Sequence, residues 1–496
     1  MFTISSWIIE FLILITITTF LAYKYFTRHY DYFKKRNVHY TKPTPLIGNM
    51  WPVLSMKLTI GEWLRGLYNT TDAPYFGIFL FDEPCLVIKS PELIKHILIK
   101  DFNYFYDRTV LASKNELTSN MLFWQKNPDW KSIRTKMTPV FSSGKLKGMF
   151  SSINEVGMDL NRYIRKNVGQ LESKEIFAKF ATDVIAKCAF AIKAGSFEEE
   201  NPEFRKVGRA FFEFNWRNGI IQSSYFFRQK WASALQLNFF EKWATEYLNN
   251  VFSFTISNRA ESNMKGHDLV DILVEMRKNK DLDGDAVVAQ AVQFFIASFE
   301  TTSSTMSFAL YELCLQPEIQ DKLREEVINS IGKYGGITYE GLKEMRYMEM
   351  CVLETLRKYP VLPFLDRRCN ADCRIDGIDL VIEKGMPVYI PLMALHYDEK
   401  YFPEPEKYDP ERFAVKNSHN LTGLYYLPFG EGPRICIGQR FGMLAVKIGL
   451  THILSEFVIE RTSETPVPVK FAARSFLLQS DVGLPMKFTK VPPTAL

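Results

Sequence analysis

The sequence predicts a mainly α-helical protein with a minor amount of β structure. Of the 496 residues, 47% are hydrophobic and 24% are charged, which is typical of a globular chain with enough apolar surface for a sizeable core. Between about Asp285 and Leu315 no proline interrupts the chain, and alanines and apolar residues recur at helical spacing. Short strand-like apolar runs lie before and after this helical middle part.

The amino terminus is a nearly uninterrupted apolar segment from Ile4 to Tyr23, with Glu10 as its one charge. It is long enough to cross a bilayer as a helix. A cleaved signal peptide has a basic start and a shorter apolar core, so we favour a retained anchor, with a removed signal as the alternative. Basic residues follow the segment and none precedes it, which places the remaining chain on the cytosolic side. These residues are Lys24, Arg28, Lys34, Lys35 and Arg36.

The apolar start, the basic residues after it and the prolines divide the chain into three parts. Pro43 and Pro45 stiffen the backbone and remove hydrogen-bond donors, which predicts a short rigid elbow. No repeat, low-complexity tract or long Gly/Ser linker occurs further on. We therefore expect a transmembrane anchor over 1–23, a basic linker and Pro-rich elbow over 24–49, and a single globular domain over 50–496.

The spacing of apolar residues and prolines predicts the order of elements in the globular domain. The long helix around Asp285 to Leu315 ends before Pro317, and a later helix is stopped by Tyr359-Pro360. In order, we expect a strand from Cys85 to Ile88, a helix from Glu92 to Lys100, helices over 319–331 and from Tyr339 to Lys358, strands from Arg374 to Ile382 and Met386 to Ile390 joined by a turn over 383–385, and an irregular Pro-rich stretch from Pro403 to Phe413.

Charge and cysteine content exclude several classes of protein. The 61 Lys and Arg residues exceed the 56 Asp and Glu residues by only five, too little to indicate nucleic-acid binding. Seven scattered cysteines fit a reducing compartment better than a disulfide framework. Cys369 and Cys373 form the only close pair, and without a second pair or a nearby histidine they do not support a zinc site.

The segment from Phe429 to Gly438 (FGEGPRICIG) is the most informative motif. Its glycines permit tight turns and close approach to a flat ligand. A helical run begins near Gln439, and the free amides at its start can hydrogen-bond a thiolate on Cys436. The alternative is an ordinary buried cysteine in a glycine-rich turn.

This segment resembles the haem-binding loop of the cytochrome P450 family, and the resemblance covers nearly the full chain. It implies the cytochrome P450 fold, with haem b (iron protoporphyrin IX) held between the long central helix and the Cys-bearing loop and helix. Cys436 would be the axial iron ligand, whose thiolate favours O–O cleavage of bound dioxygen. Further implied haem contacts are Phe429, Gly430, Gly438 and Ala297.

Four other residues resemble the family's propionate contacts. Trp130 and Arg134 match its Trp-x-x-x-Arg motif, and Arg434 and Arg367 look like further partners. The planar guanidinium of arginine suits a carboxylate. The alternative for each arginine is an ordinary surface position.

Glu354 and Arg357 share a helix face, a spacing that by itself indicates only a weak surface ion pair. The resemblance adds Arg412 to them in a buried network that supports the haem loop. We therefore expect a structural role for these three residues. Their charges must be fully satisfied if they are buried.

The segment 297–302 (ASFETT) resembles the family's oxygen-binding motif, with Ser298 where glycine is usual. The resemblance implies a proton relay in which Glu300 and Thr301 are the catalytic residues and Thr301 is the hydrogen bonder on the oxygen side. Hydroxyl side chains can bend a helix, so a local opening is expected over 301–305. The alternative is a polar patch on a core helix.

By resemblance, an apolar cavity above the iron selects lipophilic compounds. The motif details look most like insect microsomal members that oxidise plant toxins and insecticides, and endogenous hormones or lipids are the other substrates left open. The expected pocket residues are the loop from Phe102 to Leu122, Phe294, Phe295 and Ala297, the segment 361–363, and Phe476 and Leu477.

The resemblance implies an NADPH- and O2-dependent monooxygenase in the endoplasmic reticulum membrane, with its catalytic domain facing the cytosol. NADPH-cytochrome P450 reductase is the expected electron donor, and cytochrome b5 is a further candidate. The expected docking residues are Lys131, Lys136, Arg440 and Lys447. Two alternatives remain: a reductase-independent haem-thiolate isomerase or dehydratase of peroxides, and a non-catalytic haem or ligand-binding protein.

Overall fold

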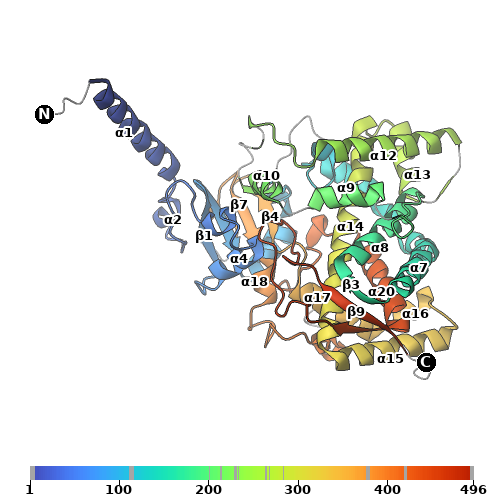
Figure 1. The fold of residues 1–496 in the computed structure, drawn as a ribbon. Coiled ribbons are helices and arrows are strands. Elements are labelled where there is room, and N and C mark those ends of the chain that lie inside the picture. Colours follow the sequence, from blue (N-terminus) through green and yellow to red (C-terminus); the bar gives the residue numbers. More distant parts are fainter. Residues whose placement is uncertain are drawn as a thin grey trace.

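A computed structural model describes residues 6–110, 117–199, 202–212, 215–227, 232, 234–262, 265–266, 268–282, 284–375, 380–417 and 422–491. Helices form most of the body, and a small sheet lies on the side nearest the amino terminus (Figure 1). This arrangement confirms the expected mainly α-helical protein with minor β structure.

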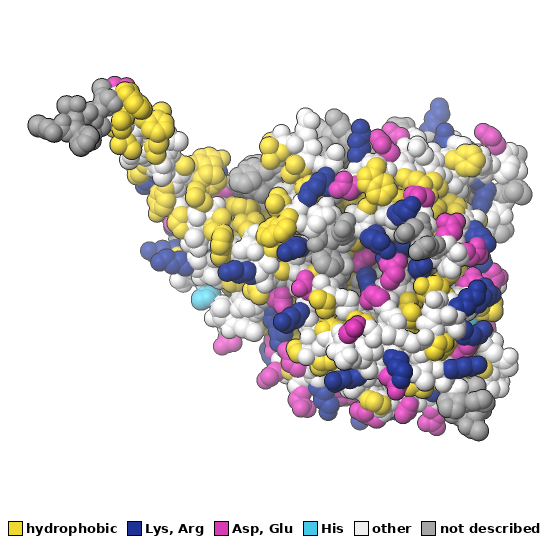
Figure 2. Space-filling model, in the orientation of Figure 1, with side chains coloured by type: hydrophobic (Ala, Val, Ile, Leu, Met, Phe, Trp, Pro, Cys, Tyr) yellow, Lys and Arg dark blue, Asp and Glu magenta, His cyan; other side chains and the backbone are white. Residues whose placement is uncertain are grey.

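Helix α1 (Ser6–Thr27) projects from the body beside this sheet (Figure 1). Its apolar side chains form a continuous hydrophobic surface in Figure 2, and those of Trp7 and Leu14 are 68% and 61% exposed. By length and composition, Trp7–Thr27 could cross a membrane, and none of it is buried in the body. Exposed apolar surface of this extent is unfavourable in water, so α1 is compatible with a membrane anchor.

The segment after α1 packs on the body. Phe33 of α2 (Tyr32–Lys35) is completely buried and its ring contacts that of Phe79. Tyr40 forms a β-bridge with Gly77. The sheet continues this packing with the order β1-β2-β7-β4, comprising β1 (Tyr75–Leu80), β2 (Glu83–Ile88), β7 (Pro387–Ile390) and β4 (Leu365–Arg368). The β2–β7 pair is parallel, whereas the β1–β2 and β4–β7 pairs are antiparallel.

Helix α14 (Gly284–Leu315) runs through the centre of the body (Figure 1) and confirms the expected long helix. Most of its side chains are buried around the whole circumference, as expected for a core helix. It contacts α8 (Ser173–Phe190), α20 (Gln439–Glu456), α12 (Lys242–Ser262) and α17 (Arg346–Lys358). Residues on different faces of α14 therefore meet different surroundings.

The remaining elements surround this centre. The helices are α3 (Trp51–Leu54), α4 (Ile60–Tyr68), α5 (Pro91–Lys95), α6 (Asp129–Met137), α7 (Ser143–Lys166), α9 (Glu203–Phe212), α10 (Trp216–Phe227), α13 (Leu269–Lys278), α15 (Pro317–Tyr334), α16 (Tyr339–Glu344) and α18 (Leu392–His396). The strands are β3 (Gly169–Glu172), β8 (Phe457–Arg461) and β9 (Pro485–Lys490) in one sheet, and β5 (Cys373–Arg374) and β6 (Val381–Ile382) in another.

Three expected elements differ from the structure. The helix expected from Tyr339 to Lys358 is divided at Met345, because the carboxylate of Glu326 accepts hydrogen bonds from the amides of Tyr347 and Met348, both at 2.8 Å, and so caps a new helix. The helix expected over 92–100 continues beyond α5 as a π-helical turn over 96–100. The strand expected over 374–382 is represented by β5 and β6, with 376–379 outside the described residues.

Candidate active site around Cys436

A cavity of about 290 Å³ lies between α14 and the segment that precedes α20. The expected haem contacts Ala297, Phe429, Gly430 and Cys436 line it. Gly438 lies two residues after the cysteine but does not line the cavity, since it serves as the amino-terminal cap of α20. The other lining residues include Thr301, Thr302 and Thr305 of α14, Val352 and Leu356 of α17, and Gly442, Met443 and Val446 of α20.

The backbone of the cysteine segment needs glycine at two positions. Gly430 and Gly432 have φ values of +74° and +73°, which L side chains rarely adopt. A Cβ atom on Gly432 would lie 2.0 Å from the carbonyl oxygen of Leu98. The Cys436 N–H donates to the Phe429 carbonyl at 2.9 Å. This hydrogen bond closes the turn and fixes the position of Cys436 at the wall of the cavity.

The surroundings of the Cys436 thiol contain groups that stabilise a negative charge. Burial raises the pKa of Cys436, whereas the amides of Gly438 and Gln439 and the nearby guanidinium of Arg134 lower it. A coordinated metal deprotonates a thiol outright. The two amides at the start of α20 would then hydrogen-bond the resulting thiolate.

One side of the cavity carries buried cations. Burial and the neighbouring Arg108 lower the pKa of Arg367 to about 9, and burial, Arg108 and Arg367 lower that of Arg434 to about 8. Asp366 is a carboxylate partner of Arg108, with 3.1 Å between Oδ1 and Nη1. Within the described part of the chain, the buried Nε atoms of Arg108 and Arg367 have no hydrogen-bond partner. Such a cluster favours binding of an anionic group.

Trp130 and Arg134 of α6, the two residues that resemble the family's Trp-x-x-x-Arg motif, also line the cavity. The guanidinium carbon of Arg434 lies 4.2 Å from the centre of the Trp130 ring, which is a cation–π contact. The Arg434 side chain also donates to the carbonyls of Tyr106 and Gln125, at 2.6 and 3.0 Å. The expected residues Trp130, Arg134, Arg367 and Arg434 are therefore brought together. Arg108 lies in the loop expected to line the pocket, but its place in this arginine cluster was not expected because it belongs to none of the motifs.

Glu354 and Arg357 form a buried ion pair on the face of α17 that points away from the cavity. Two bonds join them, from Nε to Oε2 at 2.7 Å and from Nη2 to Oε1 at 2.8 Å, and both side chains are fully buried. The Nε of Arg412 lies 3.4 Å from Oε1 of Glu354. The Asp409 amide donates to the same oxygen. The structure thus assembles the three expected residues into one network.

His396 connects this network to the cysteine segment, and the sequence analysis missed it. Its Nδ1 donates to the carbonyl of Arg357 at 3.1 Å, and its Nε2 accepts from the Leu427 N–H at 3.1 Å. These partners fix one neutral tautomer. Burial and Arg357 lower the pKa of His396 to about 3. A neutral histidine therefore links the carboxyl end of α17 to the chain two residues before Phe429.

Glu300 and Thr301 lie on different faces of α14. Thr301 lines the cavity and its hydroxyl donates to the Ala297 carbonyl at 2.7 Å. Glu300 is buried on another face, where its Oε1 lies 2.5 Å from Nζ of Lys174. Burial lowers the pKa of Lys174 despite this partner. The α14 backbone stays helical throughout 301–305, so the expected local opening is not present, because the threonine hydroxyls bond to carbonyls without breaking the helix.

Several expected pocket residues lie elsewhere. Phe294 stacks on Phe141, Phe295 packs against Phe204, and Phe476 stacks on Phe226 at 3.8 Å. These rings stabilise the core because aromatic pairs bury large apolar areas. Of the expected loop over 102–122, residues 111–116 lie outside the described residues. Of the expected apolar pocket residues, Leu122, Ala297, Val361 and Leu362 line the cavity, together with the neighbouring Phe123.

The expected electron-donor contacts are not equally available. Lys131 and Arg440 are exposed. Lys136 is paired with Asp281 at 2.5 Å. Lys447 is only 8% exposed and lies 3.8 Å from Glu349, so it is a poor docking residue.

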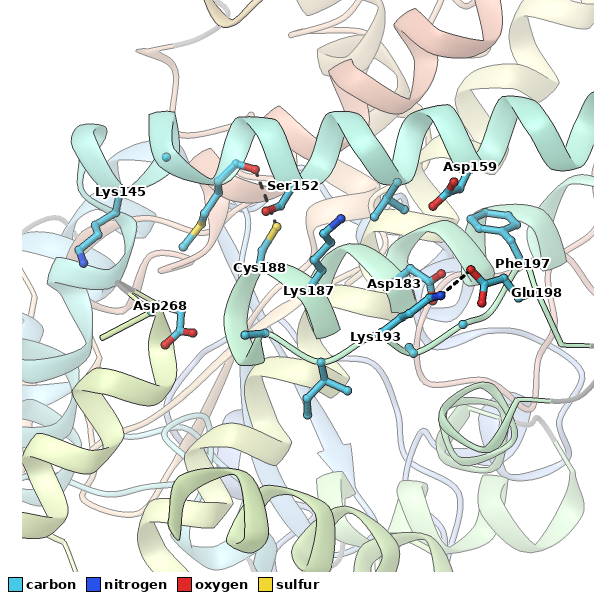
Figure 3. Close-up of a pocket in the computed structure, with 18 of the residues that line it drawn as sticks. Lys145, Ser152, Asp159, Asp183, Lys187, Cys188, Lys193, Phe197, Glu198 and Asp268 are labelled. Atoms are coloured by element: carbon cyan, nitrogen blue, oxygen red, sulfur yellow. Dashed lines mark hydrogen bonds and ion pairs between the residues drawn. The ribbon is translucent and has the colours of Figure 1, made fainter. Parts of the chain in front are cut away.

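A larger cavity of about 740 Å³ lies between α7 and α8 (Figure 3). Two of its lysines have carboxylate partners. Lys193 pairs with Glu198, as Figure 3 shows, and Lys187 pairs with Glu155. Cys188 in its wall has a pKa raised to about 12 by burial, which makes it unreactive. The Cys188 thiol is therefore a poorer candidate for a metal ligand than that of Cys436, whose pKa burial also raises but two amides and Arg134 lower.

Cys436 faces an apolar cavity and lies beside a cluster of buried arginines. This combination is typical of a haem-thiolate protein. A family model described as cytochrome P450 matches residues 38–484. The chain belongs to the cytochrome P450 family and is a haem monooxygenase.

The relatives cover nearly the full chain. Cytochrome P450 6k1 of Blattella germanica is 40% identical, over 95% of each chain. Cytochrome P450 6j1 of the same organism is 38% identical, over 99% of each chain. The probable cytochrome P450 6g2 of Drosophila melanogaster is 37% identical, over 97% of this chain and 98% of its own.

The residues at the site fit an iron porphyrin. Cys436 supplies the sulfur ligand, and the unpartnered Nε atoms of Arg108 and Arg367 can receive propionate oxygens. Gly442 lines the cavity, and a Cβ there would meet open space rather than protein. A flat group can therefore approach the α20 backbone closely.

Proposed function

We propose that the protein is an NADPH- and O2-dependent monooxygenase of lipophilic small molecules, with plant toxins and insecticides as the expected substrates. The observation that carries this proposal is the Cys436 thiol facing an apolar cavity opposite Thr301. An apolar cavity selects ligands by desolvation and shape. The full-length similarity to cockroach and fly cytochromes P450 supports the haem monooxygenase class.

The cofactor would be held from three directions. Cys436 would bind the iron, while Trp130, Arg134, Arg367 and Arg434 would receive the propionates. The network of Glu354, Arg357 and Arg412 would support the cysteine segment from behind. When bound, haem supplies the one-electron and dioxygen chemistry, and the protein supplies orientation and electrostatics.

The chain's own task in the reaction is to deliver protons to the cavity. The Thr301 hydroxyl is the group on the cavity side, able to accept a proton from water and donate its own. Glu300 lies on another face of α14, where its carboxylate is paired with Lys174. Glu300 would have to leave Lys174 to reach water on the Thr301 side, so their ion pair would regulate the relay.

The electron donor would be NADPH-cytochrome P450 reductase, with cytochrome b5 as a second donor. Lys131 and Arg440 are the exposed basic residues available for docking. Complementary charge speeds encounter and is weakened by salt. Helix α1 would hold the protein in the endoplasmic reticulum membrane, next to a reductase in the same bilayer.

Reconstitution with reductase tests the proposal. We expect consumption of NADPH and O2 with formation of an oxygenated product from a lipophilic insecticide. Turnover of a lipid hydroperoxide without NADPH, and no oxygenation with it, would instead indicate a peroxide isomerase. A reduced carbonyl complex without the thiolate-type spectrum would overturn the assignment of Cys436.

A further inference from the structure

The side chain of Gln293 presents a polar group to the cavity beside Cys436. Gln293 lies on α14, and Ala297, Thr301 and Thr305 follow it at intervals of four residues. Residues at this spacing share one helix face, and all four line the cavity. The face that carries the Thr301 hydroxyl therefore also carries a carboxamide two turns earlier.

One backbone amide sets the orientation of this carboxamide. The Phe123 N–H donates to Oε1 of Gln293 at 2.7 Å. The oxygen end is therefore occupied, and the amide cannot be turned round without losing this bond. Among the residues that the structure describes, none accepts a hydrogen bond from Nε2 of Gln293. Its N–H donors are available to a ligand.

Gln290, nearly one turn earlier, uses both ends of its carboxamide. Its Oε1 accepts from the Leu122 N–H at 3.1 Å, and its Nε2 donates to the carbonyls of Ala286, at 3.1 Å, and Asn120. It is completely buried. Gln290 therefore joins α14 to the loop before α6, whereas Gln293 leaves its donor end free.

Three other polar side chains of the cavity have partners in the protein, although the Nε atom of Arg108, assigned above to a propionate, has none among the described residues. The hydroxyls of Thr301 and Thr305 donate to carbonyls of α14. Arg108 is bound to Asp366, and its guanidinium lies 4.1 Å from the centre of the Phe123 ring. The surrounding side chains are apolar, and in such a cavity a few placed polar groups fix the orientation of the ligand. Those apolar side chains are Leu122, Phe123, Val361 and Leu362.

We propose that Gln293 selects and orients the substrate. The site takes neutral lipophilic molecules that carry an acceptor oxygen, as in an ester, ketone or ether, and this oxygen binds Nε2 while the apolar part extends toward Thr301. Eight residues of helix separate Gln293 from Thr301, which is roughly 12 Å along the axis. This separation sets how far from the acceptor oxygen the substrate is oxidised. The inference rests on the proposed monooxygenase function.

Three ligands of equal length test it on the haem-loaded, full-length protein. Dodecyl methyl ether carries an acceptor, tetradecane has none, and tridecanol carries both a donor and an acceptor. Binding is measured from the absorbance change of the ferric haem. For Gln293→Leu, we expect the Kd for the ether and the alcohol to rise roughly two- to tenfold relative to tetradecane, which corresponds to one lost hydrogen bond.

Gln293→Met, with a side chain of similar length, should give the same change in the ratio of ether to alkane Kd. Gln290→Leu is the matched control, because it loosens the loop and should shift the Kd of all three ligands together. An unchanged ether-to-alkane ratio in both Gln293 variants would overturn the inference. Failure of the proposed function is a separate result, since the wild-type protein would then lack the thiolate-type spectrum and oxidise none of the ligands.

Discussion

The Nζ atom of Lys174 lies 2.5 Å from Oε1 of Glu300 and also donates to the hydroxyls of Ser303 and Ser304, at 2.9 and 2.8 Å. A lysine on α8 thus holds the glutamate that precedes the cavity threonine. The Glu300 side chain is 3% exposed and that of Lys174 is 26% exposed. Because both charges are largely removed from water, each depends on the other.

Loss of Lys174 should therefore destabilise the fold. Lys174→Met leaves the Glu300 carboxylate buried without its cation, and we expect a loss of about 2 kcal/mol in the free energy of unfolding. Adding Glu300→Gln should restore much of it. Urea denaturation of the two single variants and the double variant measures this coupling. As a control, Lys193→Met breaks an exposed pair with Glu198 and should change the free energy of unfolding by less than about 0.5 kcal/mol. Additive effects of Lys174→Met and Glu300→Gln would contradict the prediction.

Thr301→Ala should uncouple electron use from oxygenation. The variant keeps the haem ligand but loses the hydroxyl on the cavity side, so we expect normal NADPH consumption with a smaller share of product. The ratio of product formed to NADPH consumed is the measurement. Thr305→Ala is the control, since its hydroxyl also bonds to a carbonyl of α14. Because Thr305 also lines the cavity, equal uncoupling in both variants would show that the effect is not specific to Thr301.

Cys436→Ala should remove the sulfur ligand without disturbing the propionate side. We expect loss of the thiolate-type spectrum of the reduced carbonyl complex and loss of oxygenation. Cys188→Ala, at a buried cysteine in the wall of the larger cavity, should leave the spectrum unchanged. An intact thiolate-type spectrum in Cys436→Ala would show that another residue binds the iron.

His396 should make the protein sensitive to acid. Its pKa of about 3 lies below the ordinary value of 6.5 because of burial and Arg357, so between these values the unfolded chain binds a proton that the folded chain does not. Stability is then lost as pH falls from about 6.5 toward 3, by at most about 1.4 kcal/mol per pH unit. His396→Gln can retain one donor and one acceptor and should show a flatter pH dependence in denaturant titrations. Identical slopes for the two proteins would refute this role.

Charge reversal at Lys131 should slow turnover with reductase. We expect Lys131→Glu to reduce the rate at low salt and to show a weaker salt dependence than the wild-type protein, because one attractive charge is replaced by a repulsive one. Steady-state rates across a salt series measure this. Haem content and the carbonyl spectrum should be unchanged. Wild-type turnover that is insensitive to salt would exclude electrostatic docking at this surface.

Residues within short motifs could be predicted from the sequence, and residues brought in by tertiary contacts could not. Trp130, Arg134 and Cys436 stand in short segments that resemble motifs of the family, so this local resemblance identified them. Lys174 lies 126 residues from Glu300 in sequence, and nothing in its own neighbourhood indicates that partner. The same holds for His396, whose role depends on contacts 39 and 31 residues away.

The same limit applies to predicting the fold from the sequence. The long helix α14 was predictable because it is continuous in sequence, whereas the break at Met345 arises from Glu326 on another helix. Phe294 and Phe295 are apolar, as pocket residues commonly are, but their positions around α14 place their rings in the core. Periodicity identifies a helix, and only its neighbours decide which of its faces meets the cavity.

The packing of the segment after α1 bears on how a soluble form could be prepared. Arg28 Nη2 lies 2.9 Å from Oδ2 of the buried Asp82, and the Tyr30 hydroxyl shares its one proton between the carbonyls of Thr44 and Phe81. Cutting the chain at the prolines would remove these contacts together with the Phe33 ring, and so uncover Phe79 of the sheet. A shortened protein for crystallisation should keep Arg28 and begin just before it.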